Sequence, residues 1–118
     1  MRLYGIRIFV DDLAAARHFY ERDLGLAVKW THEKVAVGYD LGVDLIVEEV
    51  DVEAEEDDQA LVGRFVGCSI AVDDIDGLYE RLTAKGVAFV GPPEKQSWGG
   101  KLAHFEDPSG NVLTLLGT

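Results

Sequence analysis

The chain has 118 residues, of which 47% are hydrophobic and 28% charged, with a formal net charge of −11 and one cysteine. This length predicts a single domain that buries about two thirds of the surface of the unfolded chain. No apolar run approaches the roughly 20 residues of a membrane helix, the N-terminus lacks a signal-peptide pattern, and the lone Cys68 excludes an internal disulfide. We therefore expect a soluble, cytoplasmic protein with a buried thiol.

The negative charge is concentrated in one short stretch. Eight of the 22 acidic residues lie between Glu48 and Asp58, which leaves 14 acids against 11 bases elsewhere. We expect this stretch to be a solvated linker at about residues 51–62. Because the chain has no basic stripe, we expect no binding to nucleic acid, and nothing in the pattern indicates a membrane partner.

The first half predicts the order βαβββ. A strand from Leu3 to Val10 alternates between two faces. The core face holds Tyr4, Ile6, Ile8 and Val10, and the other face holds Gly5, Arg7 and Phe9. Asp11 or Asp12 caps a helix that runs to about Arg22 and ends before Gly25. Three strands follow, at Ala27–Thr31, Val35–Leu41 and Asp44–Val50.

The second half repeats this order. Ile-Phe-Val-Asp-Asp-Leu at 8–13 recurs 62 residues later as Ile-Ala-Val-Asp-Asp-Ile at 70–75. The expected elements are a strand at Phe65–Val72, a helix at Ile75–Lys85 capped by Asp74, and strands at Ala88–Val90, Lys101–Glu106 and Val112–Leu116. A duplicated unit of this size needs its twin to bury its apolar face. We predict one domain, with module 1 at about 1–50 and module 2 at about 63–118.

Three motifs carry a resemblance to a known family. They lie at Val10–Leu26, at Ala71–Asp76 with Lys85–Phe89, and at Trp98–Leu113. The chain resembles the vicinal oxygen chelate superfamily, which includes glyoxalase I, extradiol dioxygenases, fosfomycin-resistance enzymes and bleomycin-binding proteins. The resemblance implies an α+β fold, in which two tandem βαβββ modules form a cupped mixed sheet with helices on the convex face and a ligand in the cup.

The resemblance also marks four positions for metal ligands. The family's metal enzymes place one His, Gln or Glu on each of four strands and leave the ion open to two substrate oxygens. Aligned by the motifs, these positions hold Gly5, Gly67, Thr114 and Ile46, or Glu48 if the strand is shifted by two residues. Catalytic divalent ions normally have about three protein ligands. We therefore predict no metal and no cofactor.

A few polar side chains remain as candidates for acid or base chemistry. His18 and His32 are expected at the surface, in a helix and a turn. His104 and Glu106 fall on one face of a strand, and with Glu48 they are the candidate catalytic residues. The alternative is that His104 and Glu106 are exposed polar neighbours.

Seven residues are predicted to bind a ligand. They are Arg7, Phe9, Trp30, Tyr39, Ser69, Trp98 and Thr114. We hypothesise that Arg7 pairs with an acidic or carbonyl group of the ligand while Phe9 stacks on it; alternatively, Glu48 neutralises Arg7. Trp98, before two glycines, either closes over the ligand or anchors the rim. Trp30 and Tyr39 line the pocket or belong to the core.

These observations favour a metal-free protein that binds a small organic molecule, resembles the bleomycin-resistance type and sequesters a toxic or antibiotic compound. The alternative is a metal-independent enzyme, such as a glyoxalase-like lyase, an isomerase or an epimerase. A third possibility is a groove for a peptide or another chain. We expect a homodimer, because open sheet edges gain from pairing and many relatives are dimers.

Overall fold

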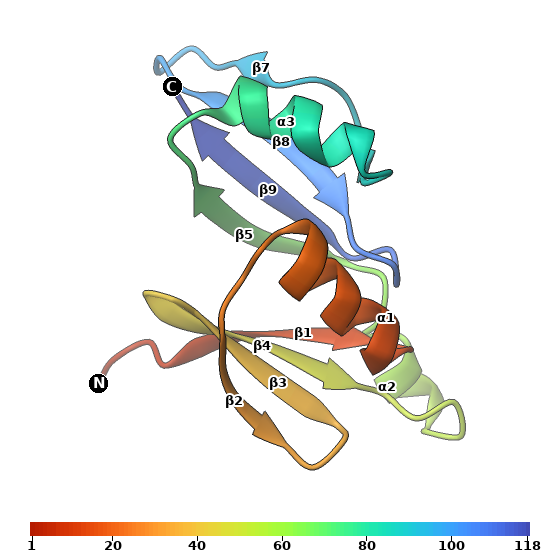
Figure 1. Ribbon diagram of the computed structural model, residues 1–118. Coiled ribbons are helices and arrows are strands. Elements are labelled where there is room, and N and C mark those ends of the chain that lie inside the picture. The colour runs from red at the N-terminus through yellow and green to blue at the C-terminus, as the bar shows by residue number, and fades with distance from the viewer. The chain divides into compact units, whose positions relative to one another are not determined.

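The computed structural model describes residues 1–118, which form two compact units (Figure 1). Unit 1 comprises Met1–Arg64 together with Pro108–Asn111. Unit 2 comprises Phe65–Asp107 together with Val112–Thr118. None of the helices has the length and apolarity that crossing a bilayer requires.

Unit 1 contains one four-stranded mixed sheet. Its elements are β1 (Gly5–Val10), α1 (Leu13–His18), the π-helical turn η1 (Phe19–Asp23), β2 (Val28–His32), β3 (Ala36–Leu41), β4 (Val43–Glu49) and the short helix α2 (Glu56–Gln59). The strand order is β1-β4-β3-β2, with β1 parallel to β4 and the other pairs antiparallel. The predicted helix to about Arg22 spans α1 and η1, and only the short helix α2 is an addition to the elements that the sequence predicts in this unit.

Unit 2 contains a second mixed sheet. Its elements are β5 (Phe65–Ala71), α3 (Ile75–Ala84), β6 (Ala88–Phe89), β7 (Glu94–Lys95), β8 (Lys101–Glu106) and β9 (Val112–Gly117). The order is β5-β9-β8-β6, β7 also pairs with β8, and β5 is parallel to β9. Apart from the short β7, this is the order of unit 1. The predicted α+β class with tandem βαβββ modules is confirmed.

The second aspartate of each repeated pair starts a helix. The Asp12 Oδ1 accepts a hydrogen bond from the Ala15 amide at 3.1 Å, and the Asp74 Oδ1 accepts one from the Gly77 amide at 3.0 Å. Each carboxylate satisfies an amide that the first helical turn leaves without a partner. The sequence allowed either Asp11 or Asp12 as the N-cap of the first helix, and the structure shows that it is Asp12.

The helices cover one face of each sheet, and the core lies beneath them. The fully buried side chains of this core include Ile8, Val10, Tyr39, Leu45 and Val47 in unit 1 and Ile75, Leu82, Phe105 and Leu113 in unit 2. The predicted inward face of β1 is thus confirmed at Ile8 and Val10, whereas Ile6 is half-buried and Tyr4 precedes the strand and is 56% exposed. Cys68 is buried, as predicted, and burial raises the pKa of its thiol.

The turn between β8 and β9 belongs to unit 1. Within it, Asn111 is only 1% exposed. Its Oδ1 accepts hydrogen bonds from the amides of Gly63 and Arg64, both at 3.0 Å, and its Nδ2 donates to the carbonyl oxygen of Phe9 at 2.8 Å. The Asn111 side chain therefore connects the end of β1 to the end of the acidic linker through hydrogen bonds.

Candidate functional site

Each sheet has a second face, opposite its helix, which we call its open face. In unit 1 the strand register sets Arg7 beside Ile46 and Phe9 beside Glu48, with Gly38 on the far side of Ile46. The open face of unit 1 includes Gly5, Arg7, Phe9, Trp30, His32, Ala36, Gly38, Asp40, Asp44, Ile46 and Glu48. Four of the residues predicted as ligand-binding or catalytic, namely Arg7, Phe9, Trp30 and Glu48, therefore come together on one surface.

Arg7 and Glu48 form a bidentate ion pair on this face. The Arg7 Nε lies 3.0 Å from the Glu48 Oε1, and the Arg7 Nη2 lies 2.8 Å from the Glu48 Oε2. The hydrogen bond to Glu48 raises the pKa of Arg7. The Arg7 Cζ is also 5.1 Å from the centre of the Phe9 ring, in a cation–π arrangement. Glu48 thus neutralises Arg7, while the Arg7 side chain, 61% exposed, keeps other N–H groups available.

Trp30 lies flat against the backbone of β3. A Cβ at Gly38 would overlap three atoms of the Trp30 indole, so only glycine leaves room for the ring. The Trp30 Nε1 donates to the Asp44 Oδ2 at 3.0 Å, and the Lys29 Nζ donates to the Asp44 Oδ1 at 2.8 Å. These two hydrogen bonds, first that of Lys29, lower the pKa of Asp44. Trp30 is therefore held in one orientation on the open face.

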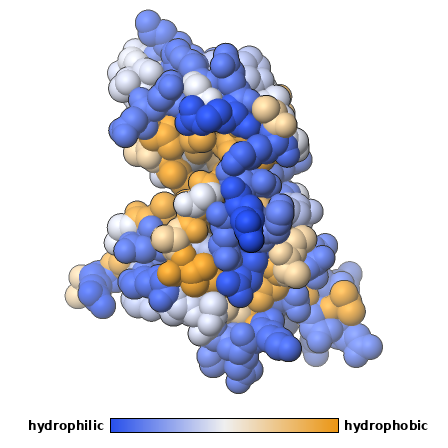
Figure 2. All heavy atoms as spheres, in the orientation of Figure 1, coloured by the Kyte–Doolittle hydropathy of each residue, from blue (hydrophilic) through white to orange (hydrophobic).

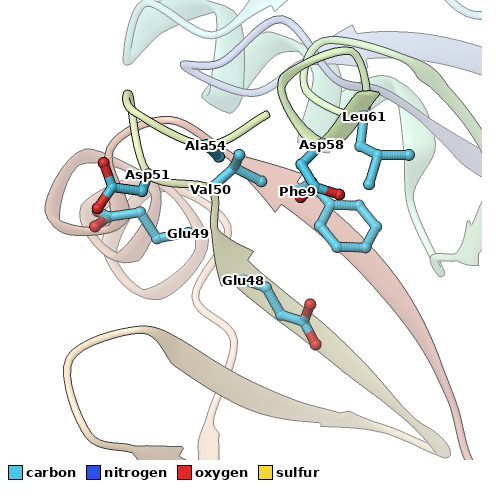
Figure 3. Close-up of a pocket in the computed structure, with 8 residues that line it drawn as sticks. All are labelled: Phe9, Glu48, Glu49, Val50, Asp51, Ala54, Asp58 and Leu61. Atoms are coloured by element: carbon cyan, nitrogen blue, oxygen red, sulfur yellow. The ribbon is translucent and has the colours of Figure 1, made fainter. Parts of the chain in front are cut away.

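A pocket of about 240 Å³ lies at the Phe9 end of this face (Figure 3). Its lining is half apolar and half acidic, and consists of Phe9, Val50, Ala54, Leu61, Glu48, Glu49, Asp51 and Asp58. Two of the carboxylates have backbone partners, since Glu49 accepts from the Leu13 amide at 2.7 Å and Asp51 from the Glu53 amide at 2.8 Å. The acidic linker with α2 therefore forms a wall of the pocket.

The open face of unit 2 carries a different set of side chains. Ser69, Thr114 and His104 occupy neighbouring positions on three adjacent strands. The His104 Nδ1 lies 2.8 Å from the Thr114 Oγ1, and the Phe65 ring meets the His104 ring edge-on at 6.1 Å. Glu106, two residues along β8, is exposed on the same face. Thr114 therefore orients His104.

Trp98 lies outside the strands, in the turn before β8. It is 60% exposed, and its ring covers Gly100, where a Cβ would overlap it. Figure 2 shows that hydrophobic side chains reach the surface of both units among hydrophilic ones, and Phe65 and Val90 are further large exposed examples in unit 2. Trp98 stays a predicted ligand contact.

Tyr39, one of the seven predicted ligand contacts, instead belongs to the core, which was the alternative that its sequence context allowed. It lies on the helix-covered face, is fully buried, and donates its hydroxyl to the Glu21 Oε2 at 2.9 Å. Arg17 donates to the same carboxylate oxygen at 2.7 Å. Burial and the bond to Glu21 raise the pKa of Tyr39 far above its usual value. His18 in α1 and His32 are exposed, as expected, although His32 ends β2 and does not lie in a turn.

The four positions that the resemblance marks for metal ligands do not fit a divalent ion. At Gly5 a Cβ would lie 2.6 Å from the carbonyl oxygen of Asp44, and Gly67 has a φ of +71°, which disfavours any side chain. Ile46 has no donor, Glu48 is bonded to Arg7, and Thr114 is bonded to His104. No three His, Cys, Asp or Glu side chains are grouped so that they could hold a metal.

Sequence reasoning missed Gly38, Lys29 and Asp44 as parts of the site. Signals pointed to Gly38 and Asp44 only: a glycine inside a strand indicates a bulge or a close approach, and an aspartate in an apolar strand needs a partner. Neither signal names that partner, because the contacts of Gly38 and Asp44 with Trp30 cross between strands.

Comparison with known proteins places this geometry in a family. Residues 2–115 match the model of the Glyoxalase/Bleomycin resistance protein/Dioxygenase superfamily. The chain is 30% identical to the uncharacterized protein YraH of Bacillus subtilis (strain 168), over 98% of this chain and 97% of that protein.

Solved structures agree with this assignment. A superfamily member from Sphaerobacter thermophilus DSM 20745 is 29% identical, with a TM-score of 0.81, over 100% of this chain and 98% of that one. TnmS3, an antibiotic binding protein from Streptomyces sp. CB03234, is 28% identical, with a TM-score of 0.77, over 99% of this chain and 95% of that one. The chain therefore belongs to the Glyoxalase/Bleomycin resistance protein/Dioxygenase superfamily.

Proposed function

We propose that this protein binds a small organic molecule without a metal ion, and that the open face of unit 1 carries the binding site. The observation that carries the proposal is the composition of this face. The Arg7 guanidinium, the rings of Phe9 and Trp30, and the adjoining pocket combine apolar walls with a few oriented polar groups. That combination is typical of sites for small ligands.

Two further observations support the proposal. The chain is similar along almost its whole length to TnmS3, a protein described as antibiotic-binding. In addition, Gly5, Gly67 and Ile46 offer no side-chain donor at the family's metal positions, whereas Thr114 and Glu48 are bonded to His104 and Arg7. We therefore propose that side chains alone hold the ligand and that the protein sequesters a toxic or antibiotic compound.

A thermal-shift screen tests this function. The protein is heated with a panel of small organic molecules that includes antibiotics, once with EDTA and once with divalent ions. Because a ligand that binds only the folded state stabilises it by mass action, we expect at least one compound to raise the melting temperature equally under both conditions. Stabilisation by divalent ions alone, or by no compound, would contradict the proposal.

Arg7→Ala tests the site. If Arg7 contacts the ligand, its loss should weaken the affinity for the compound found in the screen by about tenfold, the equivalent of one hydrogen bond to a charged group. Arg64→Ala is the matched control, because Arg64 is an exposed arginine of the same unit and lies outside the open face. Equal affinities of the two variants would remove Arg7 from the site.

We also propose that the protein forms a homodimer. β1 and β2 are the edges of the sheet in unit 1, and β5 is an edge of the sheet in unit 2. Edge strands present backbone groups that a second copy can pair. Light scattering coupled to size-exclusion chromatography should therefore give twice the mass of 13.0 kDa, and a monomer at micromolar concentration would contradict this.

A further inference from the structure

We propose that Asp44 is a positioning residue that fixes Trp30 as a rigid aromatic platform, and that the ligand stacks a planar conjugated ring system on the outer face of this indole. The inference rests on the proposed function, because it names the ligand class and a further residue of the same site. It starts from three contacts that fix the indole: one beneath the ring, one at its edge, and one on the carboxylate that holds the edge.

The contact beneath the ring sets its plane. Three indole atoms, Cε2, Nε1 and Cζ2, lie where the Cβ of any other residue at position 38 would be. The inner face of the ring therefore rests on the backbone of β3. Trp30 is still only half-buried, so part of the indole remains open to solvent.

The contact at the edge stops the ring from turning. The Trp30 Nε1 donates to the Asp44 Oδ2 at 3.0 Å, and Asp44 is only 3% exposed. The other carboxylate oxygen accepts from the Lys29 Nζ at 2.8 Å. Both oxygens of Asp44 on β4 thus accept hydrogen bonds from residues of β2, which lies beyond β3 in the sheet, and the carboxylate cannot rotate without losing one of these bonds.

A bulge in β2 makes this arrangement possible. Consecutive residues of a regular strand point to opposite faces of the sheet. Between Val28 and Trp30 the register of β2 against β3 shifts, and both Lys29 and Trp30 then reach the same carboxylate. Bulges redirect side chains in this way. A bulge, a glycine and a buried aspartate therefore act together to fix the orientation of the Trp30 indole.

A preset indole favours a flat ligand. A ligand that meets an ordered ring loses little additional side-chain freedom on binding, and aromatic rings prefer offset stacking. Next to Trp30 the face continues over apolar Ile46 to Arg7, whose guanidinium lies over Phe9. Two strand spacings of about 4.8 Å each separate β3 from β1, which is the width of a fused ring system.

The test uses Trp98→Phe as the parent protein, because Trp30 is then the only tryptophan of the two in the chain. Three variants are made in it: Asp44→Ala, Asp44→Asn and, as the matched control, Asp40→Ala. Asp40 faces Asp44 across β3 and β4, is exposed, and bonds to the Gly42 amide rather than to Trp30. Acrylamide quenching of Trp30 fluorescence reports how firmly the ring is held.

Binding is measured with two neutral alcohols, planar 9-anthracenemethanol and globular 1-adamantanemethanol, by NMR titration of the Trp30 indole N–H. We expect the planar probe to bind at least about fivefold more tightly than the globular one. Asp44→Ala should increase quenching and weaken the planar probe roughly two- to tenfold. Asp44→Asn keeps an acceptor for the indole and should therefore show the quenching and the planar-probe affinity of the parent. Asp40→Ala should change neither the quenching nor the affinity.

Three results would overturn the inference. One is equal affinity for the planar and the globular probe, or no binding of either. Another is an Asp44→Ala protein that melts at a lower temperature with quenching and affinity unchanged, because that describes a purely structural residue. The last is a compound from the thermal-shift screen that binds Asp44→Ala and Trp30→Leu as tightly as the parent. This last result would leave the proposed function standing, whereas a screen without any ligand would remove that function itself.

Discussion

The two units keep the same helix-covered face and differ on the open face. Under the helix, Tyr39 opposite Leu45 in unit 1 corresponds to Phe105 opposite Leu113 in unit 2, and both aromatic rings are fully buried. On the open face, Gly38 beneath Trp30 corresponds to His104 bonded to Thr114. The two modules therefore share the residues that build the core, whereas the residues on the open faces, which do not build the core, differ.

The repeated glycines of β1 and β5 show how far this divergence goes. Gly5 lies in a regular ladder, where its lack of a side chain allows the close approach of the Asp44 carbonyl oxygen. Gly67, 62 residues later, has a φ of +71° at a register shift, with nothing nearer to its missing Cβ than the Phe65 ring at 3.8 Å. One residue type therefore meets two different physical demands, space in unit 1 and backbone conformation in unit 2.

The largest effect is expected at Asn111, in the turn that belongs to unit 1 although β8 and β9 on either side of it belong to unit 2. Asn111→Ala removes the partners of two amides and one carbonyl at a buried site, and should lower the free energy of unfolding by about 2–4 kcal/mol in urea denaturation. Hydrogen exchange should accelerate at Gly63 and Arg64 while the β8–β9 pairing of unit 2 stays protected. Ser109→Ala, in the same turn, should cost about 1 kcal/mol or less. An equal loss in both variants would contradict the role of Asn111.

Substitution by alanine and by asparagine distinguishes the role of Gly5 from that of Gly67. Gly5→Ala forces a Cβ against the backbone and should cost about 1–3 kcal/mol, and Gly5→Asn should be no better. Gly67→Ala should cost about 1–2 kcal/mol, and Gly67→Asn less, because asparagine tolerates positive φ. Chemical denaturation of the four variants measures this. Rescue by asparagine at both positions, or at neither, would show that the two glycines are equivalent after all.

Exchanging the buried aromatic residues tests the shared core. Tyr39→Phe removes the bond to Glu21 and should cost about 1.5–3 kcal/mol at neutral pH. Burial raises the pKa of Tyr39, so the folded protein keeps this phenol protonated, whereas the unfolded chain ionises it near about pH 10. The advantage of the native protein over Tyr39→Phe should therefore shrink as the pH rises above about 10.

The reverse exchange supplies the control. Phe105→Tyr brings a hydroxyl into the fully buried position of unit 2, and we expect a loss of about 1–3 kcal/mol. Urea denaturation of both variants across the pH range gives the comparison. A neutral Phe105→Tyr would mean that the two helix-covered faces are interchangeable at this position.

The smallest effect is expected at the ion pair of the unit 1 open face. Because the Arg7 side chain is mostly exposed, a double-mutant cycle with Arg7→Ala and Glu48→Ala should give a coupling of at most about 1 kcal/mol, weaker in high salt. A coupling several times larger and independent of salt would instead make this pair part of the stable framework, like the residues of the helix-covered face.

Local signals explain why most of the fold was predictable. Alternation located the strands to within one or two residues, and the paired aspartates marked both helix starts, because a cap acts on amides three residues away. Tyr39 shares the alternation of Val37, which is also fully buried, and this parity was the signal for its place in the core.

The site was less predictable because its contacts cross between strands. A glycine within a strand indicates a bulge or a close approach, and nothing near it in sequence says which of the two. Trp30 reaches Gly38 and Asp44 on different strands, so its orientation depends on the register and on the bulge of β2. A helix to about Arg22 was predicted, but the π-helical geometry of its last part, η1, has no sequence signal that we recognise.

The place of Asn111 has a consequence for the making of the protein. The hydrogen bond between Asn111 and Phe9 joins positions 102 residues apart. As the polypeptide leaves the ribosome, the strands of unit 1 emerge first, yet the Phe9 carbonyl gains this hydrogen bond only after the β8–β9 turn has been translated. Contacts so distant in sequence slow folding. The nascent first half therefore remains incomplete until the final hairpin appears.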